Sequence, residues 1–354
     1  MCIRDRITGV AGFLGSHLAD KLSAMNNRII GVDNMLGGYK DNIPKNIDFF
    51  NYDCCDLKKM NEIMKGVDVV YHCAATAHEG LSVFSPVEIT KNNYMASISV
   101  FTAAISNNVK RIIFCSSMAR YGDQQTPFTE NMTPKPVDPY AISKVAAENV
   151  LINLCELHDV EWVIAVPHNI IGPRQKYDDP FRNVVSIMIN RMLQKKAPII
   201  YGDGEQKRCF SYVDDCISCL IPMMNQKNLH REIINKGPDE EFVTINKIAE
   251  MCSNITGINL GSKKGGGVGF GDLKSMAKKG LEKGKGALKA GAFLKNIPSM
   301  ILAMASLDDV FVIFVYSVLI NIYTAYNSNQ EQDLVSGVSE YMVECENVAS
   351  EKIK

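Results

Sequence analysis

The sequence lacks a charge excess of either sign. Its 354 residues include 38 Lys and Arg against 39 Asp and Glu, a formal net charge of -1. A protein that binds nucleic acid through its overall charge needs a basic excess, so this balance excludes a general polyanion binder. With 46% hydrophobic residues, the chain can bury a sizeable core in one large or two smaller domains.

A cysteine framework and a secretion signal are also missing. The eleven cysteines are scattered without paired spacing, and no signal peptide precedes the first glycine-rich turn, so we expect a cytoplasmic protein in a reducing compartment. Cys216 and Cys219 form a C-x-x-C, but no second Cys or His pair stands near them at zinc-like spacing. We interpret both as core thiols and predict no metal site.

The sequence does contain a glycine-spaced turn, formed by Gly9, Gly12 and Gly15, with an apolar helical pattern that continues to Leu22. Such a turn lets the backbone approach a pyrophosphate, and the helix that begins there points unpaired N–H groups at the phosphates. Taken alone the pattern is weak, because three glycines in a loop can also serve only a tight turn.

The strand expected before this turn is anomalous. A strand inside a parallel sheet is buried on both faces and should be a nearly continuous apolar run, but residues 4–6 read Arg-Asp-Arg. These charges would cost several kcal/mol at the centre of a sheet unless they are paired or displaced to the strand end. Our hypothesis is that residues 1–6 are not the native start and come from an expression leader or an error of sequence assembly.

From Gly9 to about residue 165, strand-like and helix-like patterns alternate, which predicts a doubly wound, Rossmann-like α/β domain with a parallel sheet. The second strand, residues 27–33, ends at Asp33, 18 residues after Gly15. A carboxylate there would bind the ribose hydroxyls of NAD and repel a 2′-phosphate. Asp33 alone could equally be a helix cap or a solvated strand end, but together with the glycine turn it favours NAD.

Three further strands are expected at residues 47–52, 67–75 and 111–115, and the last delivers Ser117 to its carboxyl end, where ligands sit in open α/β sheets. A helix then begins near Tyr140 and places Lys144 one turn away on the same face. An unperturbed tyrosine has a pKa near 10, and a neighbouring ammonium would favour its phenolate form.

Together these motifs resemble the extended short-chain dehydrogenase/reductases from Ile7 to Ile258, most closely nucleotide-sugar epimerases and dehydratases similar to UDP-glucose 4-epimerase. The resemblance implies that Ser117, Tyr140 and Lys144 are catalytic. It also implies a UDP-sugar substrate, bound NAD and a homodimer. Beside Tyr140 and Lys144, the implied NAD-site residues are Gly9, Gly12, Phe13, Leu14, Gly15, Asp33, Asn34, Asp53, Cys54, Ala74, Ala75, Asn93 and Pro167.

One position separates branches of this family. Similar dehydratases carry an Asp-Glu pair after the catalytic hydroxyl residue, and decarboxylating relatives keep a glutamate, but Ser117 is followed by Met118 and Ala119. This favours an NAD-dependent 4-epimerase that oxidises the sugar transiently at C4. A dehydratase or reductase of the same family is the alternative. We have no explanation from the sequence for Arg120, where relatives often have an apolar residue.

Residues 166–259 are predicted to form a smaller substrate lobe. The resemblance implies substrate contacts for Asn169, Asn183, Tyr201 and Arg208. A guanidinium can bind phosphate, an amide can read a polar edge and a ring can stack on a base. Each also has a structural interpretation: Tyr201 begins an obvious turn, and Arg208 can pair with a nearby acid.

The resemblance fades after residue 258. Residues 260–296 form a Gly/Lys-rich linker, and residues 297–354, predicted to be mainly helical, contain two apolar blocks within 297–320 separated by Asp308 and Asp309. These blocks are together long enough to cross a bilayer, although two central carboxylates would be expensive there. The region is of uncertain origin. An inactive chimera with a membrane-associated segment and a non-catalytic NAD sensor are further alternatives, although an intact Tyr/Lys pair counts against the sensor.

Overall fold

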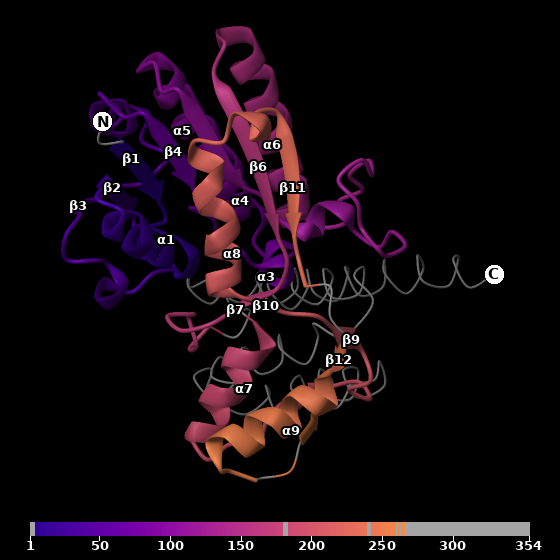
Figure 1. Ribbon diagram of the computed structural model, residues 1–354. Coiled ribbons are helices and arrows are strands. Elements are labelled where there is room, and N and C mark those ends of the chain that lie inside the picture. The colour runs from indigo at the N-terminus through magenta and orange to yellow at the C-terminus, as the bar shows by residue number, and fades with distance from the viewer. Residues whose placement is uncertain (1–3, 180–182, 239–241, 260, 262, 266–354) are drawn as a thin grey trace, which may run out of the picture. The chain divides into compact units, whose positions relative to one another are not determined.

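The computed structural model describes residues 4–179, 183–238, 242–259, 261 and 263–265 (Figure 1). The chain divides into two compact units, residues 1–264 and 265–354. The predicted linker and apolar segment, including 297–320, lie almost entirely outside the described residues. Within the described part of the chain, no helix is long and apolar enough to cross a membrane.

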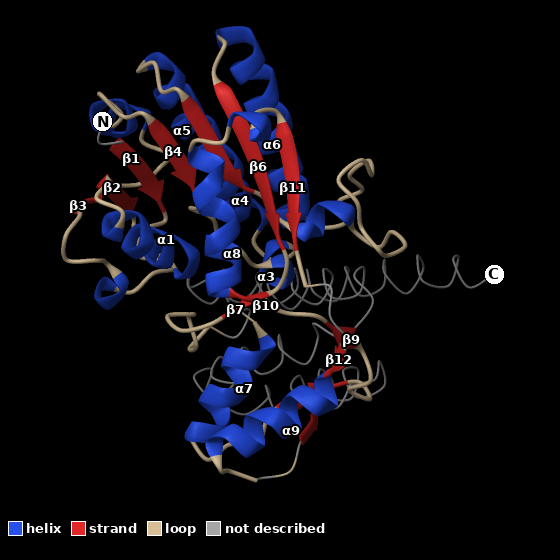
Figure 2. Cartoon of the chain, viewed as in Figure 1, coloured by secondary structure: helices blue, strands red, loops and turns tan. Residues whose placement is uncertain are grey.

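Seven parallel strands form the main sheet, in the order β11-β6-β5-β4-β1-β2-β3 (Figure 2). This confirms the predicted doubly wound fold. The strand order reverses between β1 and β4, and such a reversal opens a crevice at the carboxyl ends of the strands. The strands are β1 (Arg4–Thr8), β2 (Arg28–Asp33), β3 (Asp48–Asn51), β4 (Val69–His72), β5 (Arg111–Cys115), β6 (Glu161–Pro167) and β11 (Glu232–Lys236).

Helices cover both faces of this sheet because successive strand side chains point to opposite sides. On β5, Ile112 packs with α2 (Leu57–Ile63), α5 (Ala96–Ser106) and α6 (Pro139–His158). The next residue, Ile113, packs with α1 (Phe13–Ala24) and α8 (Val213–Leu220), and α8 lies in front of the sheet in Figure 1. The crevice therefore lies at the end of a sheet that is buried on both faces.

A smaller lobe has its own apolar core between α7 (Val184–Leu193) and α9 (Ile245–Thr256). The predicted lobe, 166–259, is not continuous, because α8 and β11 belong to the main sheet layer. The remaining strands are β7 (Ile170–Ile171), β8 (Ile199–Tyr201), β9 (Lys207–Arg208), β10 (Ser211–Tyr212), β12 (Val243–Thr244) and β13 (Lys263–Gly265). The remaining helical segments are η1 (Lys40–Asn42), α3 (Glu79–Ser82), α4 (Pro86–Ile89), η2 (Thr90–Met95), η3 (Met118–Tyr121), η4 (Ile221–Met224) and η5 (Lys227–Leu229).

The charged residues expected to be anomalous lie in β1, between β2 and β4. Asp5 accepts a hydrogen bond from Asn27 at 2.8 Å, and burial raises its pKa to about 6. Arg6 is fully buried, its guanidinium has no hydrogen-bond partner among the described residues, and burial lowers its pKa to about 9. Arg4 is exposed at the start of the strand, whereas Asp5 and Arg6 are buried inside it and are not fully paired. The strand therefore forms at the energetic cost of burying these two charges.

Candidate active site

The glycine turn is shaped by close backbone contacts. Gly9 has a φ of +72°, and a Cβ at this position would lie 2.8 Å from the backbone of Ala74. A Cβ at Gly15 would lie 2.2 Å from the carbonyl oxygen of Gly9. Gly12 is the N-cap of α1, whose first turn carries no acidic side chain. The turn and the helix end therefore leave room and positive potential for a pyrophosphate.

Asp33 ends β2 beside this turn. Its carboxylate accepts hydrogen bonds from Ala11 N at 3.0 Å and from Met35 N at 2.7 Å. Burial raises the pKa of Asp33 above its ordinary value, while these backbone hydrogen bonds act to lower it. The carboxylate is thus fixed at the position where a ribose would bind.

A cavity of about 790 Å³ runs from the glycine turn across the carboxyl ends of the strands. Most of the predicted NAD residues line it. They are Gly9, Gly12, Phe13, Leu14, Gly15, Asp33, Asn34, Asp53, Cys54, Ala74, Ala75, Tyr140, Lys144 and Pro167. The glycine turn leaves no room for a Cβ at Gly9 or Gly15, and backbone hydrogen bonds hold the Asp33 carboxylate beside it. This arrangement fits a dinucleotide.

Asn93 does not line this cavity. Its side chain binds the backbone of Thr76 in two places, accepting from Thr76 N at 2.7 Å and donating to Thr76 O at 3.2 Å. The carbonyl oxygen of Asn93 accepts from Ser97, whose hydroxyl also contacts the buried His72 at 2.9 Å. Asn93 therefore shapes the loop after β4, and Thr76 is the residue exposed to the cavity.

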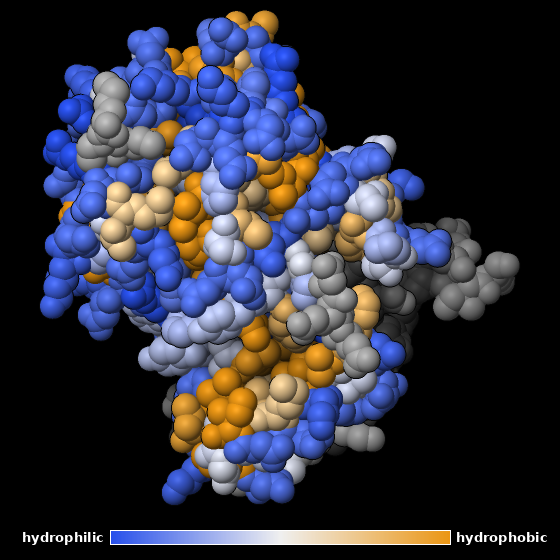
Figure 3. Space-filling view, viewed as in Figure 1, coloured by the Kyte–Doolittle hydropathy of each residue, from blue (hydrophilic) through white to orange (hydrophobic). Residues whose placement is uncertain are grey.

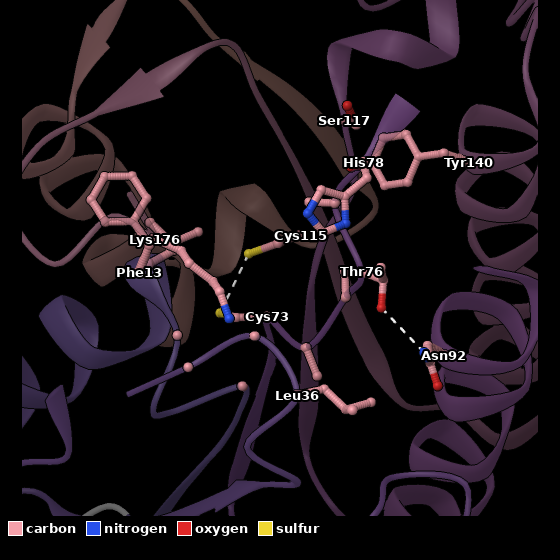
Figure 4. A pocket seen from close by; sticks show the side chains of 18 of the residues that line it. Phe13, Leu36, Cys73, Thr76, His78, Asn92, Cys115, Ser117, Tyr140 and Lys176 are labelled. Atoms are coloured by element: carbon pink, nitrogen blue, oxygen red, sulfur yellow. Dashed lines mark hydrogen bonds between the residues drawn. The ribbon is translucent and has the colours of Figure 1, made fainter. Parts of the chain in front are cut away.

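The three predicted catalytic residues line the cavity, and Figure 4 shows the side chains of Ser117 and Tyr140 there. Ser117 follows β5 and caps η3, with its hydroxyl accepting from Ala119 N at 3.2 Å. Tyr140 and Lys144 lie one turn apart on α6, which Asp138 caps. Lys144 donates to the carbonyl oxygen of Cys115 at 2.8 Å. Burial lowers the pKa of the Lys144 ammonium to about 8, while the Cys115 and Cys73 thiols and Glu148 act to raise it.

Arg120 has a defined partner, which the sequence did not reveal. Its guanidinium forms a buried ion pair with Glu148 at 3.0 Å, one helical turn beyond Lys144 on α6. The other Glu148 oxygen accepts from the hydroxyl of Ser116. Arg120 also donates to the hydroxyl of Tyr121 at 3.1 Å. The ion pair therefore joins α6 to the segment that carries Ser117.

The four predicted substrate residues divide into two groups. Asn169 and Asn183 line the cavity, and Asn183 also caps α7. Tyr201 and Arg208 do not line it. Arg208 is exposed and donates to Lys207 O at 2.9 Å, although its charge acts to lower the pKa of the cavity residue Glu79. The side-chain amides of Asn169 and Asn183 therefore lie at the cavity. Contacts of Tyr201 and Arg208 with a substrate stay a prediction.

Several cavity residues were not predicted from the sequence: Thr76, His78, Glu79, Asn92, Lys176 and Asp179. The residues after β4 could have been predicted from the sequence, because ligands bind at the carboxyl ends of strands in such sheets. Asp179 lies 101 positions after its partner His78, and no local pattern connects them. Cys216 packs in the apolar core, and the described residues contain no cluster of three or more metal-ligating groups.

The family described as the NAD dependent epimerase/dehydratase family matches residues 6–237. The chain belongs to this family. A putative UDP-glucose 4-epimerase of Methanocaldococcus jannaschii is 35% identical over 71% of this chain and 82% of the relative. A UDP-N-acetyl-alpha-D-glucosaminuronate decarboxylase of Bacillus cytotoxicus is 33% identical over 72% of this chain and 80% of the relative.

Among solved structures, the UDP-glucose 4-epimerase of Thermotoga maritima with UDP-glucose matches with a TM-score of 0.69 and 31% identity, over 74% of this chain and 85% of that one. Membership of the family confirms the predicted resemblance. The chain is an NAD-dependent enzyme of the short-chain dehydrogenase/reductase superfamily, and its glycine turn and Asp33 are the residues fitted to hold the cofactor. The relatives include both epimerases and several decarboxylases, so family membership alone leaves the reaction open.

Proposed function

We propose that this chain is a UDP-sugar 4-epimerase. The observation that carries the proposal is the convergence of Ser117, Tyr140 and Lys144 on the cavity, with no carboxylate on the η3 segment that follows Ser117. Elimination of water requires an additional acid and base, whereas inversion at C4 requires a single reversible proton shuttle beside the cofactor. Met118 and Ala119 occupy the positions that carry acids in similar dehydratases.

The proposed mechanism gives each residue one task. Tyr140, held as phenolate by the Lys144 ammonium, takes the proton of the sugar 4-hydroxyl, and Ser117 shares that hydrogen bond. Bound NAD would supply the acceptor for the hydride that leaves C4 and the donor that later returns it. The 4-keto sugar then turns over in the cavity, so that the opposite face of C4 is presented to the cofactor. Tyr140 returns its proton to the sugar O4 oxygen. Net redox change is zero, so the cofactor need not leave.

The test is incubation of purified protein with UDP-glucose, UDP-N-acetylglucosamine and UDP-glucuronate, without added NAD. Formation of the C4 epimer of at least one sugar, followed by NMR, supports the proposal. Release of carbon dioxide with a UDP-pentose product indicates a decarboxylase, and a stable 4-keto-6-deoxy product indicates a dehydratase. Either product without a C4 epimer contradicts the proposal.

A further inference from the structure

Two thiols that lie far apart in the sequence meet in the wall of the cavity. The parallel register of β4 and β5 pairs His72 with Phe114, so the next residue along each chain segment brings Cys73 opposite Cys115. Their Sγ atoms lie 3.6 Å apart, and Figure 4 draws this contact as a dashed line. Both residues line the cavity, so a small solute that enters it can reach the pair.

The backbone at this pair allows a covalent bond between the two sulfurs. Adjacent strands of a sheet lie about 4.8 Å apart, and the Cα atoms of disulfide-bonded cysteines usually lie about 4.4–6.8 Å apart. Because a disulfide bond is about 2.05 Å long, the two sulfurs would have to approach each other by about 1.5 Å. Side-chain rotation together with a small shift of the two strand ends would close this distance.

The surroundings of the pair favour a thiolate on Cys115. The hydrogen bond from Cys73 and the charge of Lys144 lower the pKa of the Cys115 thiol, although burial opposes them. The thiolate is the form that attacks hydrogen peroxide. This attack breaks the O–O bond and leaves a sulfenic acid on Cys115, while the thiol proton leaves with the other oxygen as water. The Cys73 thiol then forms the S–S bond and displaces the sulfenic oxygen as a second water.

Each cysteine also contacts a functional part of the cavity. A Cβ on Gly9 would lie 3.1 Å from the carbonyl carbon of Cys73, so the Cys73 backbone packs against the glycine turn. The carbonyl oxygen of Cys115 accepts a hydrogen bond from Lys144 at 2.8 Å. A bond that draws the two strand ends together would therefore displace the wall beside the glycine turn and the acceptor that holds Lys144.

We propose that Cys73 and Cys115 are an oxidation site for peroxides, and that the disulfide formed between them inactivates the enzyme until a thiol reduces it. In a reducing compartment such a bond is transient, and disulfides of this kind are usually catalytic or redox-sensing. The inference goes beyond the proposed 4-epimerase reaction, since it concerns whichever reaction the cavity supports.

The test treats the NAD-loaded protein with hydrogen peroxide, blocks the remaining thiols with iodoacetamide and maps the peptides by mass spectrometry without reduction. A peptide linked through Cys73 and Cys115 is expected. The rate of C4 epimer formation should fall about 10²-fold, the loss that misplacement of a catalytic group by about 1 Å can cause. Dithiothreitol should reverse both changes.

Three variants separate this pair from the other thiols. Cys115→Ala removes the attacking thiol and should keep its own untreated rate after peroxide, and Cys73→Ala should form no link. The matched control is Cys252→Ala, which changes a buried thiol in the apolar core of the smaller lobe. This control should still form the link and lose its rate on oxidation.

Absence of the linked peptide, or a link between Cys54 and Cys55 in its place, would overturn this inference. A complete link in an enzyme with unchanged rate and NAD content would also overturn it. The peptide map and the NAD released on oxidation, measured by absorbance, do not depend on the reaction. A reversible link that releases NAD from a protein that forms no C4 epimer would therefore support the oxidation site and reject the proposed reaction. C4 epimer formation that peroxide leaves unchanged would do the reverse.

Discussion

Tyr140 is the residue on which the proposed chemistry depends most directly. Tyr140→Phe removes the hydroxyl that moves the proton and keeps the ring that packs against the cavity wall, so kcat should fall about 10²- to 10⁴-fold. The measurement is the initial rate of C4 epimer formation under saturating substrate. Tyr212→Phe is the control, because Tyr212 is 46% exposed and lies outside the cavity. Near-full activity of Tyr140→Phe would reject its assignment.

The Lys144 ammonium sets the expected pH dependence. Burial lowers its pKa to about 8, so the protonated form that stabilises the phenolate is present below that pH and is lost above it. We therefore expect kcat/KM to decline as the pH rises through about 8. The measurement is the pH profile of kcat/KM, with unfolding monitored in parallel. A profile that stays flat to pH 10 would show that the charge of Lys144 is not required.

Arg6 should lower the stability of the folded chain. Its buried guanidinium has no hydrogen-bond partner among the described residues, and replacing buried charges by apolar groups often stabilises by about 1–4 kcal/mol. Arg6→Leu should therefore raise the free energy of unfolding, measured by urea denaturation. Arg28→Leu is the control, since its side chain is 60% exposed and pairs with Asp48 at the surface. Destabilisation by Arg6→Leu would show that the charge has a partner outside the described residues.

At the scale of elements, the Arg120–Glu148 ion pair joins η3 to α6. Breaking a buried pair by removing one partner costs about 3–5 kcal/mol, because a charge is left uncompensated. Arg120→Met and Glu148→Gln should each destabilise by this order, and the double variant should lose less than the two single losses added. Urea denaturation of the four proteins gives the coupling energy.

The exposed Lys59–Glu62 pair is the matched control for that cycle, because its side chains are 39% and 45% exposed and surface pairs contribute about 0–1 kcal/mol. Additive losses for Arg120 and Glu148 would indicate that the two side chains act independently. In that case the ion pair would not explain why an arginine stands at this position.

The sequence predicted the main sheet well, because hydrophobic runs bounded by small or polar residues are local signals. Residues 111–115 were expected to form a strand and are β5, and residues 27–33 contain β2, which is Arg28–Asp33. What the sequence could not show were contacts between distant segments. His78 meets Asp179, and Arg120 meets Glu148, only after the chain has folded.

Predicted roles failed to match the cavity where a side chain had an alternative partner. Asn93 has the amide chemistry of a ligand residue, but the backbone of Thr76 occupies both of its polar atoms. Asp5 and Arg6 show the opposite case. Their charges correctly indicated unfavourable burial, yet Arg4–Thr8 is a central strand because its backbone pairs with β2 and β4 on both sides. Backbone pairing thus outweighed the side-chain pattern.

At the scale of the whole molecule, the three apolar clusters are formed by residues between Ile7 and Ile258. The predicted tail, residues 297–354, lies outside the described residues, as does most of the predicted linker at 260–296. The predicted homodimer stays a prediction. Figure 3 shows hydrophobic surface over the lobe of α7 and α9, where Leu193 and Ile255 are 63% and 76% exposed.

Truncation after Gly265 tests whether the described residues fold and bind NAD without the residues that follow them. Because the described core is complete by Ile258 and the glycine turn lies in the main sheet layer, the shortened chain should keep its bound NAD and a single cooperative unfolding transition. The measurements are NAD content by absorbance after denaturation, and urea unfolding of the full and shortened chains. Loss of soluble protein on truncation, reversed when the exposed Leu193 and Ile255 are changed to Gln, would show that the solubility of the shortened chain depends on this face. Loss of NAD from a shortened chain that stays folded would contradict the assignment of the cofactor to residues before 168.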